Sequence, residues 1–123
     1  MSTLTEGRYA AEFLLSEGNG NISREVVTVV SGAGALKAGT VLGKVTASGK
    51  YKAAAADATD GSEDAIAIAL YDVDATSADA AVAVIARNAE VNGKILSYHA
   101  SVNTDAEKAA CAASLATAGI IVR

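Results

Sequence analysis

The side chains that could carry chemistry are few in this chain. His99 is its only imidazole and Cys111 its only thiol, so a zinc site made of these two ligand types and a disulfide within the chain are both excluded. A Ser-His-Asp triad assembles across a fold and has no fixed spacing, but no Gly-x-Ser-x-Gly motif accompanies His99. We interpret His99 as a structural or exposed residue and Cys111 as a small buried apolar one.

Three other patterns look like ligand sites but have the wrong spacing. Residues 34–40 (GALKAGT) lack the lysine that a phosphate loop carries directly before its Ser or Thr. Asp57, Asp60 and Asp64 lack the alternating oxygen ligands of an EF-hand loop and indicate an acidic turn. Lys50 lacks the neighbours of a lipoyl- or biotinyl-bearing lysine and is expected to be an exposed charge. We therefore expect no cofactor, no metal, no catalytic residues and no enzymatic activity.

Length and composition indicate one small domain that associates with other molecules. The chain has 123 residues, a mass of 12.2 kDa and a net charge of −4. Nucleic acids and anionic membranes are recognised by basic surfaces, so neither is an expected partner. Alanine accounts for 29 residues and aromatic side chains for only five, so we expect a thin core and help from oligomerisation.

Targeting signals are also missing from the sequence. No apolar run approaches the ~18 residues of a membrane span. The N-terminus has no basic region followed by an apolar stretch, which a signal peptide would need. We therefore expect the protein to be made in a cytoplasm-like compartment.

Short β-branched and alternating segments predict a mainly β domain. Strands are expected at residues 26–30, 41–46, 51–53, 65–70, 81–86 and 120–122, with turns at Ser48-Gly49 and Asp60-Gly61 and a hairpin at Asn92-Gly93. In residues 65–70 and 81–86, alanine alternates with larger apolar residues and no polar face remains. We expect both faces of these two strands to be covered, with the alanine face open to close approach by another layer or subunit.

One short helix is predicted near the C-terminus. Thr104 and Glu107 fit a capping box, in which each side chain accepts a hydrogen bond from an unpaired amide of the first turn. An alanine-rich stretch follows over residues 106–118, and Gly119 stands where the helix would end. Cys111 and Leu115 are four residues apart and share one helix face.

The first 21 residues differ from the rest of the chain. Six of the fourteen Leu, Tyr, Phe and Met residues lie in the first fifteen positions, and the segment ends at the flexible sequence Gly18-Asn19-Gly20-Asn21. This segment is either an arm that packs outside its own domain or an ordinary first strand or helix folded back on the core. Composition alone does not separate the two.

Four segments together resemble one known family. LLSEGNGNISREVVTV (14–29), LKAGTVLGKVTASGKYKA (36–53), DGSEDAIAIALYDVDAT (60–76) and TDAEKAACAASLATAGIIVR (104–123) are similar in order and spacing to the lambda-type phage head decoration protein D family. The resemblance covers nearly the whole chain. It implies a small, mainly β, β-clip-like domain with one short C-terminal helix and a flexible N-terminal arm.

The resemblance also implies a function. Such a structural virion protein is a homotrimer on the outer surface of the expanded phage head, at its three-fold and quasi-three-fold sites. It stabilises the head against the pressure of packaged DNA without touching the DNA, and its arm adds β-structure to the major capsid protein. Residues 1–21 would be the capsid-binding arm and residues 22–123 the decoration domain.

The residues expected to carry this function fall into two sets. The arm would bind through its large apolar side chains, Leu4, Tyr9, Phe13, Leu14 and Leu15. The trimer interface would use the alanine faces, Ala65, Ala67, Ala69, Ala81 and Ala83.

Two other functional classes stay open on the sequence. A β-rich adhesion or carbohydrate-binding module of a phage particle would present exposed aromatic side chains, for which Tyr51, Tyr71 and Tyr98 are the candidates. A small enzyme or accessory subunit would be built around His99.

Overall fold

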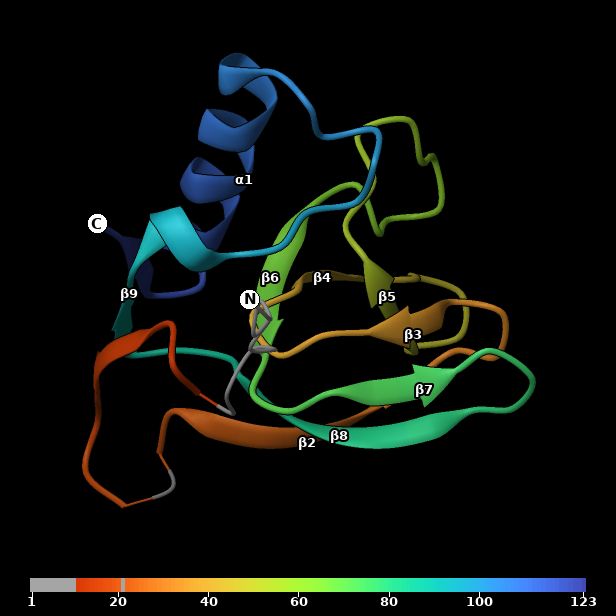
Figure 1. The fold of residues 1–123 in the computed structure, drawn as a ribbon, viewed down its shortest axis with the longest axis horizontal. Helices are drawn as coiled ribbons and strands as arrows, with labels where there is room; N and C mark the ends of the chain where they lie inside the picture. Colours follow the sequence, from red (N-terminus) through yellow and green to blue (C-terminus); the bar gives the residue numbers. More distant parts are fainter. Residues whose placement is uncertain (1–10, 21) are drawn as a thin grey trace, which may run out of the picture.

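A closed five-stranded barrel forms the centre of the structure, a computed structural model that describes residues 11–20 and 22–123 (Figure 1). The barrel strands are β2 (Arg24–Val29), β4 (Val41–Lys44), β5 (Tyr51–Ala53), β6 (Ala65–Ala69) and β8 (Ala80–Ile85), in the order β2-β5-β4-β6-β8. The neighbours are antiparallel except β2 and β5, which pair in parallel at Val29 and Tyr51 and so close the barrel. The sequence predicts each of these strands but not the closure.

Two smaller sheets flank the barrel. β3 (Gly34–Leu36) pairs with β7 (Val73–Ala75), and a three-stranded sheet has the order β1-β9-β10, with β1 at Leu14–Glu17, β9 at Ala89–Val91 and β10 at Ile120–Val122. β9 is antiparallel to β1 and parallel to β10, so this sheet joins the first and last strands of the chain. The sequence predicts β10, a run of β-branched residues, but not β1, β3, β7 or β9, each of which is short and contains at most one β-branched residue.

The hairpin predicted at Asn92-Gly93 is wrong. Asn92 instead caps a short 3-10 helix, η1 (Gly93–Ile95), by accepting a hydrogen bond from the backbone N–H of Lys94 at 3.0 Å. β9, which ends just before it, pairs with β1 and β10, which lie far away in the sequence, and not with a strand directly after the turn. An asparagine side chain that binds its own backbone two residues on serves a turn or a helix start equally well.

The predicted helix is confirmed as α1 (Asp105–Thr117), within the residues the structure describes. Thr104 and Glu107 form the capping box, and Gly119 follows the helix with a φ of 89°, a left-handed conformation that favours glycine. Cys111 and Leu115 are the buried positions of the helix, as their spacing predicts. No helix of the described residues is long and apolar enough to cross a membrane.

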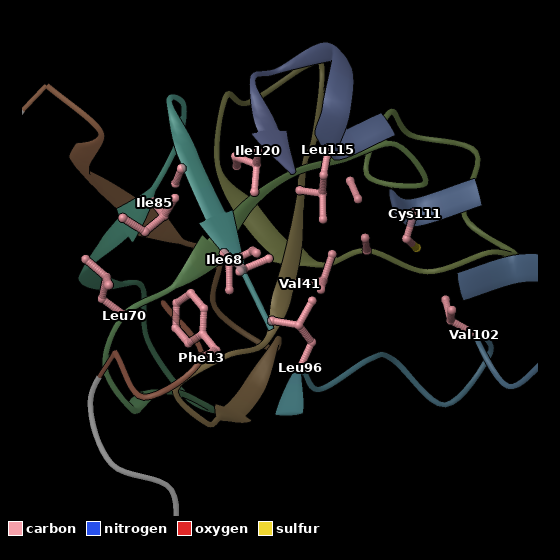
Figure 2. Close-up of a cluster of buried hydrophobic side chains, with 14 residues drawn as sticks. Phe13, Val41, Ile68, Leu70, Ile85, Leu96, Val102, Cys111, Leu115 and Ile120 are labelled. Carbon is pink, nitrogen blue, oxygen red and sulfur yellow. The ribbon is translucent and has the colours of Figure 1, made fainter. Parts of the chain in front are cut away.

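The barrel wall separates two clusters of buried apolar side chains. The cluster inside the barrel, here called the barrel cluster, includes Val29, Leu42, Ala67, Ala69 and Val84. The outer cluster fills the space between the barrel, α1 and the β1-β9-β10 sheet (Figure 2). It includes Phe13, Ile68, Leu70, Ile85, Leu115 and Ile120. β6 contributes to both clusters, because successive side chains of a strand point to opposite faces.

The alanines of β6 are covered within the subunit. Ala65, Ala67 and Ala69 are each at most 1 % exposed, so they have no area left to contribute to a contact between subunits. Ala67 and Ala69 belong to the barrel cluster, and a barrel of five strands leaves little room for larger side chains at its centre. Their small size therefore serves packing within the subunit, whereas the sequence predicts these alanines at the trimer interface.

Both faces of β6 are covered within the subunit, as the sequence predicts, whereas one face of β8 is open in the single subunit. Val82, Val84 and Ile85 of β8 are buried, whereas Ala81 is exposed and Ala83 is half-buried. The outer cluster extends over Ile85 but leaves the other end of this strand open.

Candidate interaction surface

Within residues 11–20 and 22–123, the reactive groups do not form a site with one another. His99 is exposed, and its Nδ1 lies 2.8 Å from Oγ of Ser101, two residues away. A pocket of about 410 Å³ brings His99 near Lys52 and Asp57, but the Lys52 ammonium already pairs with Asp60 at 2.8 Å. Among the described residues no group of three His, Cys, Asp or Glu side chains is placed to hold a metal ion.

The other sequence patterns have ordinary structural roles. Lys50 forms an exposed ion pair with Asp79 at 2.6 Å. Hydrogen bonds from Lys52 and from Ser62 lower the pKa of the Asp60 carboxyl. The bond from Ser62 lies within the acidic turn itself, because the two residues are two positions apart. The hydroxyl of Thr40 donates to the backbone oxygen of Lys37 in a turn between β3 and β4. Burial raises the pKa of the Cys111 thiol, so its reactive thiolate is disfavoured.

The predicted arm residues divide into three groups. Leu4 and Tyr9 lie outside the described residues. Leu15 is 54 % exposed and Leu14 is half-buried. Phe13 is 0 % exposed and belongs to the outer cluster of its own subunit. From the sequence we expect its side chain instead to contact a partner. Of the described arm residues, Leu15 is the one whose side chain is largely open to solvent.

The outer side of β2 and β8 carries the most exposed large apolar residue of the described chain. Val26 is 70 % exposed and lies opposite Ala83, while exposed Thr28 lies opposite Ala81. Directly opposed residues share one face of a sheet, so these four side chains form a single surface, here called the β2–β8 face. Two of the five predicted interface alanines therefore lie on an accessible face.

Tyr71 borders the β2–β8 face. It is 46 % exposed and follows Leu70, whose backbone N–H donates to the oxygen of Ala83 at 3.0 Å. The backbone N–H of Ala11 donates to the oxygen of the same Leu70 at 2.9 Å. The described chain therefore begins, at Ala11, next to the residue that precedes Tyr71.

An ion pair ties β1 to β2 at the end of this face. Nη2 of Arg24 lies 2.8 Å from one carboxylate oxygen of Glu17, and Nε lies 3.0 Å from the other. These hydrogen bonds hold the pKa of Glu17 below its ordinary value and raise the pKa of Arg24. Tyr71 makes a smaller contribution to this rise in the pKa of Arg24.

The outer side of the β1-β9-β10 sheet is a second exposed surface. Ser16 and Ile121 both lie opposite Glu90, and Leu15 stands in the bulge of β1 next to Ser16. Glu90 accepts a hydrogen bond from Ser16 at 3.2 Å and pairs with Arg123 at 2.6 Å. Exposed Leu15 and Ile121 thus lie next to polar side chains that pair with Glu90.

The three candidate tyrosines do not form an aromatic platform. Tyr51 packs against the barrel cluster and Tyr98 against the outer cluster, where Lys108 lies 5.6 Å from the centre of its ring. Tyr71 is the most exposed of the three. The arrangement offers no stacked pair for a sugar ring.

The sequence did not single out Val26 or Ile121 as surface residues. Val26 stands in the run VVTVV, where apolar residues occupy both faces of the strand and conceal which side is buried. Ile121 stands in Ile120-Ile121-Val122, which conceals the exposed side in the same way.

Comparison with known proteins shows a family to which the chain is similar. A family model for the bacteriophage lambda head decoration protein D matches residues 3–120. A search of curated proteins finds no relative of this chain.

Proposed function

Because the chain belongs to the bacteriophage lambda head decoration protein D family, we propose that it binds the outer surface of an expanded phage head as a homotrimer. Family membership assigns it a structural role in decorating the phage capsid, and with it a place in the virion. The proposed sites are the three-fold and quasi-three-fold positions of the shell, and the proposed partner is the major capsid protein. The bound trimer stabilises the shell against the pressure of packaged DNA.

The single observation that carries this proposal is the extent of the family match. It runs over residues 3–120, so it includes the N-terminal segment as well as the barrel, the helix and the last strand. A match confined to the barrel would support the fold alone, since one fold hosts many functions.

The β2–β8 face supports association with a second copy of the chain. Val26, Ala81 and Ala83 give it small and apolar side chains without a formal charge. Small side chains allow close approach of backbones, and a symmetric trimer matches a three-fold site without any adaptor. The core of the subunit is also rich in alanine, so burial of further apolar area between subunits adds stability that one subunit lacks.

The N-terminal segment supports attachment to the shell. Leu4 and Tyr9 supply large apolar side chains, and Leu15 continues them at the edge of the domain. β1 pairs with β9 on one side, and no described strand pairs with its other side. An extended segment can bind a foreign sheet edge by strand addition, in which backbone hydrogen bonds supply affinity and pockets for alternate side chains supply specificity. Ten extended residues reach about 35 Å, enough to contact a neighbouring capsid subunit.

Three segments on one trimer bind better than one. Ordering a segment costs roughly 1–2 kcal/mol per residue in backbone entropy, so a single arm binds weakly. Once the first arm is bound, the other two are held at a high effective concentration, and avidity gains about 10²–10⁴-fold.

Deletion of residues 2–10 tests the proposal. We expect the shortened protein to keep its folded domain, because the described core begins at Phe13, and to lose binding to expanded shells in a co-sedimentation assay. The full chain should co-sediment with expanded shells and not with unexpanded ones. Full binding by the shortened protein would contradict the role of the arm, and failure of the full chain to bind any shell would contradict the decoration function.

A further inference from the structure

Phe13 is buried although it lies close to the start of the described chain. Its side chain is 0 % exposed, whereas neighbouring Glu12 and Leu15 are exposed. The ring belongs to the outer cluster together with Ile68 and Leu70 of the barrel wall (Figure 2). A single large side chain thus attaches the N-terminal end of the described chain to the centre of the subunit.

Backbone hydrogen bonds hold the chain on both sides of Phe13. The N–H of Leu14 donates to the oxygen of Ala11 at 3.0 Å, which closes a turn around Phe13, and the N–H of Asn92 donates to the oxygen of Phe13 at 2.7 Å. The N–H of Ala11 donates to the oxygen of Leu70 at 2.9 Å. Ala11 has a φ of 58°, a left-handed conformation in which a residue other than glycine is uncommon.

A residue held in an unfavourable backbone conformation needs surrounding structure that keeps it there. Here the surrounding structure is the buried ring on one side and the bond to Leu70 on the other. Together they fix the position of Ala11, where the described chain begins, next to the residue that precedes Tyr71.

From this geometry we infer that Phe13 is a positioning residue, whose burial sets the point and direction in which residues 1–10 leave the domain. The inference rests on the proposed function, in which those residues bind the capsid. Phe13 itself does not touch the partner. It orders residues 11–14 in advance, so that binding does not have to order them, and such preorganisation increases affinity.

Release of the ring would turn residues 11–14 into a flexible tether. Each of these residues would then have to be ordered when the N-terminal segment binds. A longer flexible tether also lowers the effective concentration of the segment at its site. Both effects weaken binding without changing any residue that contacts the shell.

The main experiment compares two truncations within the same core. Phe13→Ala and Leu115→Ala each remove a large side chain that is at most 1 % exposed from the outer cluster, but Leu115 lies on α1. Both variants are measured by co-sedimentation with expanded shells, at a temperature at which circular dichroism shows them folded. We expect Phe13→Ala to bind at least about tenfold more weakly than Leu115→Ala, because several residues lose their prior ordering. Equal binding by the two variants would overturn the inference.

A second pair of variants leaves the core intact, in case Phe13→Ala does not fold. Ala11→Pro removes the N–H that binds Leu70 and holds φ near −65°, so it breaks the turn while the ring of Phe13 stays in place. Ala11→Gly keeps the N–H and accepts a positive φ. We expect weakened shell binding for Ala11→Pro and full binding for Ala11→Gly. Full binding by Ala11→Pro would overturn the inference.

Deletion of residues 2–10 in the same assay separates the two ideas. If the deletion abolishes binding while Phe13→Ala and Ala11→Pro bind fully, the arm function stands and the positioning role of Phe13 fails. If the deletion variant binds like the full chain, the arm function fails, and the positioning role fails with it.

Discussion

β6 and β8 have the same kind of sequence and lie side by side, yet their alanines occupy opposite environments. Both strands alternate alanine with Ile or Val, and they pair directly at Ile68 and Ile85. Ala67 and Ala69 of β6 are sealed inside the barrel, whereas Ala81 of β8 is exposed. The same alternation of alanine with larger residues therefore has two meanings. In β6 it fits alanine into the narrow barrel interior, and in β8 it leaves alanine on an open face.

The difference comes from what lies outside the barrel. α1 packs against β6, and the outer cluster covers the side of β6 that faces away from the barrel interior. On β8 this cover reaches Ile85 but not Ala81, since the paired strand β2 there presents exposed Val26 and Thr28. A residue pattern within one strand does not reveal how far a neighbouring layer extends.

The largest expected effect comes from filling the barrel. Ala67→Leu adds three carbons at a position that is 1 % exposed in the barrel cluster, and overpacking of this kind costs about 1–3 kcal/mol of unfolding free energy. The matched control is Ala109→Leu at an exposed position of α1, outside the β2–β8 face, where we expect a change within about 0.5 kcal/mol. Urea unfolding of both variants measures the two changes in unfolding free energy. Equal destabilisation would contradict the lack of space that we infer inside the barrel.

A charge on the β2–β8 face should affect association rather than folding. Val26→Asp changes a residue that is 70 % exposed, so the subunit should keep its stability to within about 0.5 kcal/mol. If this face forms the trimer contact, the buried carboxylate should weaken assembly by about tenfold or more. Sedimentation velocity gives the mass of the particle. Ala109→Asp, which adds the same charge at an exposed position of α1, should remain a trimer. A trimeric Val26→Asp would place the contact elsewhere.

The smallest effect concerns the ion pair at the end of the same face. Hydrogen bonds from Arg24 lower the pKa of Glu17, so the pair stabilises the folded state above the pKa of Glu17 in the unfolded chain, about 4.3. That contribution is lost as the pH falls through the lowered pKa of the folded state. Glu17→Gln should therefore cost about 0.2–1 kcal/mol at pH 7 and less at pH 3, as measured by urea unfolding at both values. A cost that does not change with pH would show that the carboxylate charge is unimportant there.

Much of the fold follows from local sequence signals. The capping box at Thr104 and Glu107 and the glycine at 119 define α1, because each acts on backbone groups within one turn. The barrel strands are recognisable from their β-branched and alternating residues. The parallel pairing of Val29 with Tyr51 closes the barrel between segments far apart in the chain, and no local signal encodes it.

The candidate surface is harder to derive from the sequence. Phe13 and Leu15 belong to the same apolar segment, but one is buried and the other exposed, because Phe13 reaches the outer cluster and Leu15 stands in a β-bulge. Gly43 shows the same dependence on distant contacts, since a Cβ at this position would lie within 2.0 Å of the backbone oxygen of Ser62. Such close approaches become visible only when both segments have been placed in three dimensions.

The β1-β9-β10 sheet has a consequence for how the protein is made. β9 needs β1, formed by residues 14–17, on one side and β10, formed by residues 120–122, on the other. Translation proceeds from the N-terminus, so a nascent chain on the ribosome holds β1 ready long before its last strand exists. A product that ends before residue 120 would lack β10 and leave one edge of β9 unpaired, and an unpaired strand edge favours aggregation.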